Sequence, residues 1–291
     1  MNKISYAITM AASSLLITLS AQAADRTVIQ NKGSDTLVNV AQAWAEAYGS
    51  VDSNVAVAVS GGGSGTGIAA MINGTVDLAN ASRQMKTKEL ELAKSKGQNP
   101  VEHVVGYDAL AVFIHQNNPV NTLSYTQLKS IYGRGGKATN WSDLGLEVPG
   151  CKGGEIVVVS RQNNSGTYAY FKQEVLGKKG KYRQGTLDMH GSKDVVDLVE
   201  KTPCAIGYSG LAYATDHIKM ACISQNGEKC VSPSVKTASD RSYPIARPLF
   251  MYTNGEPQGA IKAYLDWVKS DAGQCILKKK GYAPVRSVSC D

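Results

Sequence analysis

Three short motifs of the sequence place a serine and a threonine two residues apart. They are Ser34-Asp35-Thr36, Ser64-Gly65-Thr66 and Ser165-Gly166-Thr167. Each motif follows a short apolar segment typical of a strand and precedes a pattern typical of a helix. Because hydroxyl groups at such a junction lie beside the free N–H groups of a helix start, the motifs predict a site for an anion.

The helix N-terminus supplies the physical reason. Its first N–H groups have no intrahelical partner, and the helix dipole adds a partial positive charge there. The second motif lies in the stretch SGGGSGTGIAAM (60–71), whose glycines let the backbone come close to a ligand. Three converging junctions would surround a tetrahedral oxyanion with donors. Arg83 and Arg161, each at the end of an apolar segment, would add forked N–H pairs.

A plainer interpretation is that these hydroxyls only cap helices, since serine and threonine are good N-caps. A fourth copy, Ser124-Tyr125-Thr126, illustrates it. That copy lacks glycine, follows a loop and has Gln127 at the capping-box position, so we interpret it as a cap. For each of the other three motifs taken singly, capping remains the alternative.

Other chemistries fit the motifs poorly. A phosphate loop of the G-x-x-x-x-G-K-[ST] type needs a lysine that is missing after these glycines, and a dinucleotide fingerprint that starts at Gly61 meets Thr66 where glycine is required. The nucleophile elbow G-x-S-x-G fails at Ser64 and at Ser209. A hydrolase with a seryl nucleophile and a histidine that is distant in sequence stays open as an alternative.

The elements around the motifs indicate an α/β fold with mostly parallel sheets, because strand-like and helical patterns alternate. In such sheets ligands bind beyond the carboxyl ends of the strands. We expect helices that start after residues 36, 64 and 167 and end near Gly49, Gly74 and Gly177. The segments predicted as strands are 27–31, 55–60, 76–82, 109–115, 155–161 and 205–209.

Length and charge narrow the class of protein. Residues 1–23 have a short positive start, an apolar stretch and the cleavage-type sequence Ala21-Gln22-Ala23, which predicts a secretory signal peptide. About 268 residues remain, enough for two lobes. The formal net charge of +7 would attract small anions. Nucleic acid is not expected as a partner, and a monomer is expected.

The cysteines predict disulfides, because an even number in an exported chain favours pairing. Cys222 and Cys230 flank a turn at Asn226-Gly227, and a bond between Cys275 and Cys290 would fasten the C-terminus; Cys151–Cys204 follows by elimination. The four histidines are scattered, so neither a metal nor a cofactor is predicted.

Several motifs in order resemble the periplasmic phosphate-binding proteins of bacterial phosphate ABC transporters. They are NKGSDTL, VSGGGSGTGI, DLANASR, SRQNNSGTY and TPCAIGYSGLAYA, and the likeness covers nearly all of the chain after residue 23. The resemblance implies a two-lobed type II periplasmic binding protein. Lobe one would comprise 25–108 plus 246–291 and lobe two 109–245, with a hinge of crossing strands near 108–112 and 243–248.

The resemblance also implies the function. Such proteins bind inorganic phosphate between the lobes without chemistry and deliver it to the membrane permease of an ABC importer. The ligand residues carried over from the family are Thr36 and the N–H of Leu37, Ser64, Arg161, Ser165, Gly166 and Thr167; Ser34 is added because it lies beside the first set.

One departure from the family bears on the ligand. Many members have an aspartate that accepts a hydrogen bond from protonated phosphate where this chain has Arg83, and a second family aspartate is Asn163 here. We expect Asp108 to supply the acceptor, with Asp35 as the alternative; Asp108 could instead pair with Arg83. Receptors for sulfate or molybdate, and a surface or adhesion role, remain competing interpretations.

Overall fold

The structure is a computed structural model that describes residues 26–225 and 227–290. The predicted signal peptide lies outside the described residues. Within that part of the chain, no helix is long and apolar enough to cross a membrane. Strands and helices alternate along most of the chain, so the predicted α/β class is confirmed.

The strands form one large sheet and a small two-stranded sheet. The order in the large sheet is β2-β1-β3-β11-β4-β8-β6-β7, with β9 paired to β4. The strands are β1 (Thr27–Gly33), β2 (Val55–Ser60), β3 (Leu78–Ala81), β4 (Pro100–His115), β5 (Thr122–Ser124), β6 (Val157–Arg161), β7 (Leu187–Met189), β8 (Ala205–Gly210), β9 (Ile218–Met220), β10 (Cys222–Ser224) and β11 (Ala246–Asn254).

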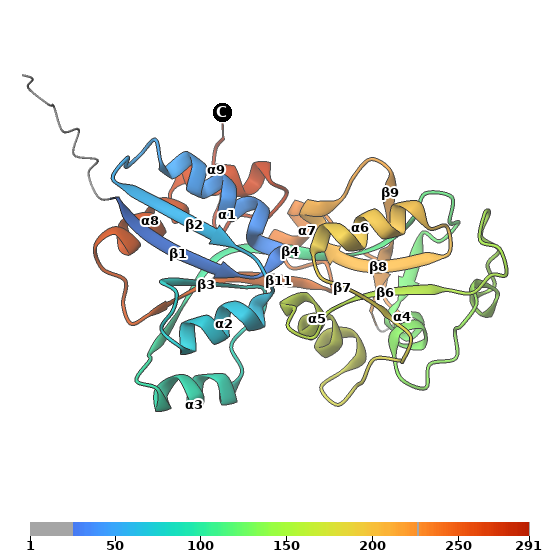
Figure 1. Cartoon of the computed structure of the whole chain (residues 1–291). Helices are drawn as coiled ribbons and strands as arrows, with labels where there is room; N and C mark the ends of the chain where they lie inside the picture. Colours follow the sequence, from blue (N-terminus) through green and yellow to red (C-terminus); the bar gives the residue numbers. More distant parts are fainter. Residues whose placement is uncertain (1–25, 226, 291) are drawn as a thin grey trace, which may run out of the picture.

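The helices connect these strands. Figure 1 shows α1, α8 and α9 beside β1 and β2 on the left, and α4 and α6 beside β6 and β8 on the right. The helices are α1 (Asp35–Tyr48), α2 (Ser64–Ile72), α3 (Thr87–Ser95), α4 (Tyr125–Tyr132), η1 (Trp141–Leu144), α5 (Gly166–Phe171), η2 (Lys172–Leu176), α6 (Ser192–Lys201), η3 (Leu211–Tyr213), α7 (Val235–Ser239), α8 (Gly259–Lys269) and α9 (Asp271–Lys279).

The sheet is more mixed than the sequence predicted. β1, β2 and β3 are parallel, as are β6, β7 and β8, but β11 is antiparallel to β3 and β4, and β4 is antiparallel to β8. The reason is that β4 and β11 run in opposite directions through the middle of the molecule (Figure 1). The expectation of mostly parallel pairing holds among β1, β2 and β3 and among β6, β7 and β8, and it fails at every pairing that involves β4 or β11.

Hydrophobic cores lie on both sides of β4 and β11. On one side, α1, α8 and α9 bury Leu37, Trp44 and Tyr264 against one face of the sheet, and α2 and α3 cover the other face. On the other side, α4, α5 and η2 cover one face and α6 covers the opposite face. We call the two groups of elements the first half (β1 to α3, α8 and α9) and the second half (β5 to α7).

Tyrosines support the start of α5 within the second half. The Tyr208 hydroxyl lies 2.7 Å from the hydroxyl of Ser160 and 2.8 Å from that of Tyr182, which donates to the carbonyl of Tyr168 at 3.0 Å. The Phe171 ring stacks on the Tyr208 ring with centroids 3.9 Å apart. Burial raises the pKa of Tyr208, so its hydroxyl stays neutral and holds this part of α5 in place.

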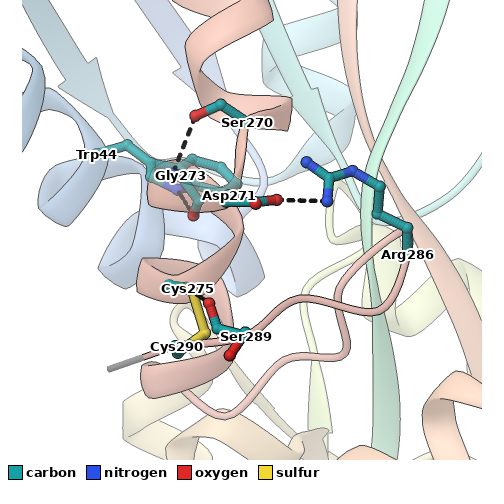
Figure 2. Close-up of a disulfide and its surroundings, with 8 residues drawn as sticks. All are labelled: Trp44, Ser270, Asp271, Gly273, Cys275, Arg286, Ser289 and Cys290. Atoms are coloured by element: carbon teal, nitrogen blue, oxygen red, sulfur yellow. Dashed lines mark hydrogen bonds and ion pairs between the residues drawn. A yellow bond between two sulfur atoms is a disulfide. The ribbon is translucent and has the colours of Figure 1, made fainter.

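The three predicted disulfides are confirmed. They join Cys151 to Cys204, Cys222 to Cys230 and Cys275 to Cys290. Figure 2 shows the last of them at the C-terminal end, where Arg286 also pairs with Asp271 and the Trp44 indole donates to the Gly273 carbonyl at 2.7 Å. The C-terminal segment is thereby fastened to α9, and α9 to α1.

Removing the C-terminal disulfide should lower the stability of the protein. Since the bond closes a loop of 15 residues, replacing Cys275 and Cys290 by serine should reduce the unfolding free energy by about 3 kcal/mol. Thermal unfolding of the double variant and of the oxidised wild type measures this as a fall in Tm of about 5 °C. An unchanged Tm would show that this disulfide adds nothing to the stability of the folded protein.

Candidate functional site

Five hydroxyl groups converge where the two halves meet, and we call them the hydroxyl cluster: Ser34, Thr36, Ser64, Ser82 and Thr167. The oxygens of Ser34 and Ser82 are 2.9 Å apart, those of Ser64 and Ser82 3.4 Å, and those of Thr36 and Thr167 3.0 Å. All five residues are at most 1% exposed. Hydroxyls can donate or accept, so such a cluster can adapt to the oxygens of a small anion.

The parallel strands explain why the first four residues meet. Their carboxyl ends share one edge of the sheet, where the Ser34 amide donates to Asn80 at 2.9 Å and the Gly63 amide to Gly33 at 3.0 Å. The hydroxyls of Ser34 and Ser64 do not cap their helices. The Ser64 hydroxyl instead accepts from the Ser82 amide at 3.0 Å. For these two serines the capping interpretation is therefore wrong.

Ser165 behaves differently. Its hydroxyl accepts from the Tyr168 amide at 3.3 Å, so it caps α5. The fourth copy of the motif, at Ser124, also has the predicted capping box with Gln127. Ser165 thus carries out the plain structural role, and a ligand role for it stays a prediction. The Leu37 amide donates to the Ser34 carbonyl at 3.0 Å, and its ligand role also stays a prediction.

Gly166 lies where the halves come closest. A Cβ atom at this position would stand 2.2 Å from the Ser64 oxygen and 2.5 Å from the Ser82 oxygen. Any side chain would therefore push the second half away from the hydroxyl cluster. The predicted importance of this glycine has a steric reason, although its contact with a ligand remains a prediction.

Arg247, which the sequence analysis did not select, reaches the hydroxyl cluster from β11. Its Nη2 donates to Thr36 at 3.2 Å and to Thr167 at 3.0 Å, and its Nη1 donates to the Ser82 carbonyl at 3.3 Å. Its Nε and Nη2 also donate to Asp108 Oδ2 at 3.1 and 2.8 Å. The side chains of both Arg247 and Asp108 are 0% exposed. The pair is formed because Arg247 and Asp108 are register partners in β11 and β4.

Asp108 therefore pairs with Arg247, and the alternative pairing with Arg83 is wrong. Burial raises the pKa of Asp108, although the charge of Arg247 acts in the opposite direction. The Leu211 amide lies close to the carboxylate of Asp108, and it lowers the pKa of that group. Oδ1 nevertheless makes no hydrogen bond of normal geometry within the described part of the chain. Asp108 thus has one oxygen that holds Arg247 and one that can still accept a proton donor.

Arg161 lies beside the hydroxyl cluster but binds other groups. It donates to Asp35 Oδ2 at 3.1 Å, to the Ser192 hydroxyl at 3.0 Å, and to the carbonyls of His190 at 2.7 Å and Met189 at 3.3 Å. Burial lowers its pKa, while the charge of Asp35 raises it. Arg161 is 1% exposed and joins the second half to the first through Asp35. A ligand role for it stays a prediction.

Three further hydrogen bonds join the halves, two beside the second motif and one at the first. The Gly65 amide donates to the Asn164 carbonyl at 2.8 Å, and the Asn164 side chain donates to the Gly62 carbonyl at 2.9 Å. The Tyr213 hydroxyl donates to the Asp35 carbonyl at 2.5 Å. The contacts of Asp35 with both Arg161 and Tyr213 show that this alternative acceptor belongs to the contact between the halves.

Arg83 binds Glu89 rather than the hydroxyl cluster. Its two terminal nitrogens donate to the two carboxylate oxygens of Glu89 at 2.8 and 2.7 Å. Burial raises the pKa of Glu89, whereas Arg83 and the Lys86 amide lower it. The lowering is the larger effect, so the pKa of Glu89 lies below its ordinary value. No contact joins Arg83 to the five hydroxyls among the residues described, so its predicted ligand role finds no support in this geometry.

The hydrogen bonds of the histidines lie outside the hydroxyl cluster. His103 lies 2.8 Å from the Thr253 hydroxyl, and His190 Nδ1 lies 3.2 Å from the side-chain oxygen of Gln162. Across residues 26–225 and 227–290, no histidine is hydrogen-bonded to a serine of the hydroxyl cluster, and no group of three His, Cys, Asp or Glu residues could hold a metal ion. Within the described residues, no histidine is therefore placed to activate a serine of the hydroxyl cluster.

Known proteins share this arrangement of strands and loops. A family model described as "PBP superfamily domain" matches residues 20–272. The Phosphate-binding protein PstS of Pseudomonas aeruginosa is 35% identical over 269 residues, which cover 88% of this chain and 83% of that protein. The chain belongs to this family of binding proteins. The predicted resemblance and the predicted fold are thereby confirmed.

Further proteins are similar to this chain over most of its length. Protein SphX of Synechococcus elongatus is 30% identical over 94% of this chain and 82% of its own length. A Clostridium perfringens crystal structure with bound phosphate is 30% identical, with a TM-score of 0.79, and covers 89% of this chain and 100% of that one. An ABC-type phosphate transport receptor from Vibrio cholerae is 25% identical, with a TM-score of 0.68, over 88% of this chain and 99% of that chain.

The buried ion pair should be important for stability. Asp108→Asn leaves the guanidinium of Arg247 buried without a counter-charge, so the unfolding free energy should fall by about 3–5 kcal/mol. Urea denaturation of the wild type and the variant at pH 7 measures this fall in unfolding free energy. Asp266→Asn, which removes an exposed partner of Lys262, is the matched control and should change it by no more than about 0.5 kcal/mol. Equal effects of the two substitutions would mean that Asp108 is already protonated in the folded protein.

Glu89 should make stability depend on acid pH. Because its pKa in the folded protein lies below the ordinary value of 4.5, its contribution is complete above that pH and is lost as the pH falls through the folded pKa. The stability difference between wild type and Glu89→Gln should therefore be largest at pH 7 and shrink below about pH 4.5. Urea titrations at pH 7, 5 and 3.5 measure it, with exposed Glu91→Gln as the control. A constant difference across that range would contradict the assignment.

Proposed function

We propose that the protein is a periplasmic receptor that binds inorganic phosphate between two lobes and delivers it to the permease of an ABC importer. The observation that carries the proposal is the convergence of five buried hydroxyls and the Arg247 guanidinium where the two halves meet. Relatives over most of the chain are phosphate-binding proteins by name. An N-terminal signal peptide over 1–23 would direct the chain to the periplasm.

The lobes are proposed as residues 25–108 plus 246–291 and residues 109–245. One boundary falls within β4 and the other at the start of β11, at the register pair Ala109 and Ala246. The hydroxyl cluster supports this division, because Thr36 and Thr167 come from different lobes and touch at 3.0 Å. An anion that takes the place of such contacts enters only when the lobes part, so the hinge of crossing strands must bend during binding.

The ligand set that the geometry supports differs from the set carried over from the family. Thr36, Ser64, Thr167 and Ser34 remain in it, Ser82 is added, and Arg247 takes the position of the central guanidinium. Arg161 instead holds Asp35 across the lobes. A guanidinium offers N–H groups to two oxygens of phosphate at once, which makes it well suited to an oxyanion.

Selectivity for phosphate can come from Asp108. Phosphate keeps a proton near neutral pH and sulfate does not, so a carboxylate oxygen with a free acceptor position favours phosphate and repels sulfate. Asp108 Oδ1 is such an oxygen within the described structure. A receptor for sulfate or molybdate would need this oxygen to be neutral or paired.

A calorimetric titration of anion-stripped protein tests the proposal. Phosphate should release heat at pH 6 and pH 8, and sulfate should release none. Arg247→Gln should weaken phosphate binding by roughly 10- to 150-fold, since a charge-assisted hydrogen bond is lost. Arg161→Gln is the matched comparison and should weaken binding less.

Three results would count against the proposal. Equal binding of sulfate would assign the site to oxyanions in general. A larger loss with Arg161→Gln than with Arg247→Gln would move the ligand away from the hydroxyl cluster. Turnover of a chromogenic phosphate ester by the wild type would make the protein an enzyme rather than a receptor.

A further inference from the structure

A second concave surface lies next to the hydroxyl cluster, on the outer side of Arg247. It is a groove of about 640 Å³ between the loop that precedes α3 and the segment α5–η2. Figure 1 shows these two segments facing each other below β11. Ser82 and Arg247 form part of its wall, so the groove and the hydroxyl cluster share these two residues.

The charged side chains of this groove are all positive. Arg83, Lys86, Lys172, Lys178 and Arg247 line it, and no aspartate or glutamate does. Arg83 and Arg247 form ion pairs with Glu89 and Asp108. The three lysines form no ion pair within the described residues.

These lysines differ from ordinary solvated charges because they gather around one groove. Lys86 belongs to the first half, whereas Lys172 and Lys178 belong to the second, yet all three face one groove. Like charges repel unless an anion lies between them, and a concave wall of one sign strengthens the local potential. The groove is therefore suited to a ligand with several negative charges that reaches both halves.

The volume and the aromatic residues narrow the class of ligand. A site of this size is in the range for molecules much larger than orthophosphate. Tyr168 is already stacked on Tyr182 with centroids 4.4 Å apart, and the Tyr170 ring packs against the Arg247 guanidinium at 5.7 Å. Both rings thus already have a partner, and the three lysines are the groups without one, which favours a wholly ionic ligand.

We propose that this groove is a second anion site that binds a condensed inorganic phosphate, such as tripolyphosphate. Such a chain of phosphoryl groups carries several charges and can contact Lys86 on one wall and Lys178 on the other. Arg247 stands between the two sites, with Nη2 on the hydroxyls of Thr36 and Thr167. The second site thus goes beyond the proposed receptor function and does not require orthophosphate to leave.

The test is calorimetry with tripolyphosphate on the full exported chain, in buffer that already contains saturating orthophosphate. Lys86→Gln/Lys178→Gln should weaken tripolyphosphate binding about five- to tenfold, the effect of losing two exposed ion pairs. Orthophosphate affinity, measured separately, should stay unchanged. Lys278→Gln/Lys279→Gln removes the same charge from exposed positions on α9 and should leave tripolyphosphate binding as in the wild type.

Absence of tripolyphosphate heat with the wild type, or equal losses in the two double variants, would overturn the proposal. Thr36→Val distinguishes it from the receptor function. This variant removes a hydroxyl of the first site, so it should weaken orthophosphate binding and leave tripolyphosphate binding intact. If both ligands weaken together, there is only one site, and the groove is not separate from it.

Discussion

The buried pair of Arg247 and Asp108 is the interaction on which the rest of the site depends. Each residue sits in one of the two strands that join the halves, and the strands align them as register partners. A buried guanidinium without a counter-charge would be too costly to keep, and Asp108 removes that cost. Arg247 is then free to direct its other N–H groups at Thr36, Thr167 and the Ser82 carbonyl. The central positive charge is thus fixed by the connection between the halves rather than by either half alone.

The hydroxyl cluster adds neutral donors around that charge. Parallel strands bring Ser34, Ser64 and Ser82 to one edge, and α5 brings Thr167 from the other side. The absence of a side chain at Gly166 allows this approach. Asp35 and Arg161 hold the halves together next to the cluster but outside it. The arrangement separates two roles that both need buried charge: Arg247 and Asp108 hold the hydroxyl cluster, and Arg161 and Asp35 join the halves.

Local patterns in the sequence were enough to predict the fold class and most of the hydroxyls. Ser34, Thr36, Ser64 and Thr167 could be selected because a strand end, a short hydroxyl motif and a helix start follow one another in sequence. The three disulfides could also be predicted, since spacing limited the pairs.

Interactions between distant residues could not be predicted in the same way. Arg247 and Asp108 are 139 positions apart, and Arg161 and Asp35 are 126 apart. Nothing local indicates which arginine a carboxylate will meet. The one available signal was Arg247 itself, a lone charge within the apolar stretch 245–252, where burial requires a partner. Ser82 was missed because its hydroxyl lies at the end of a strand without the Ser-x-Thr spacing.

The disulfides have a consequence for how the protein matures. Cys151–Cys204 and Cys222–Cys230 lie within the second half, and Cys275–Cys290 fastens the C-terminus to the first. Since none of these bonds links the halves, oxidation can complete each half independently of the other. The disulfides therefore stabilise each half separately, and the two halves are linked covalently only through the main chain of β4 and β11. Disulfide formation can therefore stabilise each half without adding a covalent bond between them.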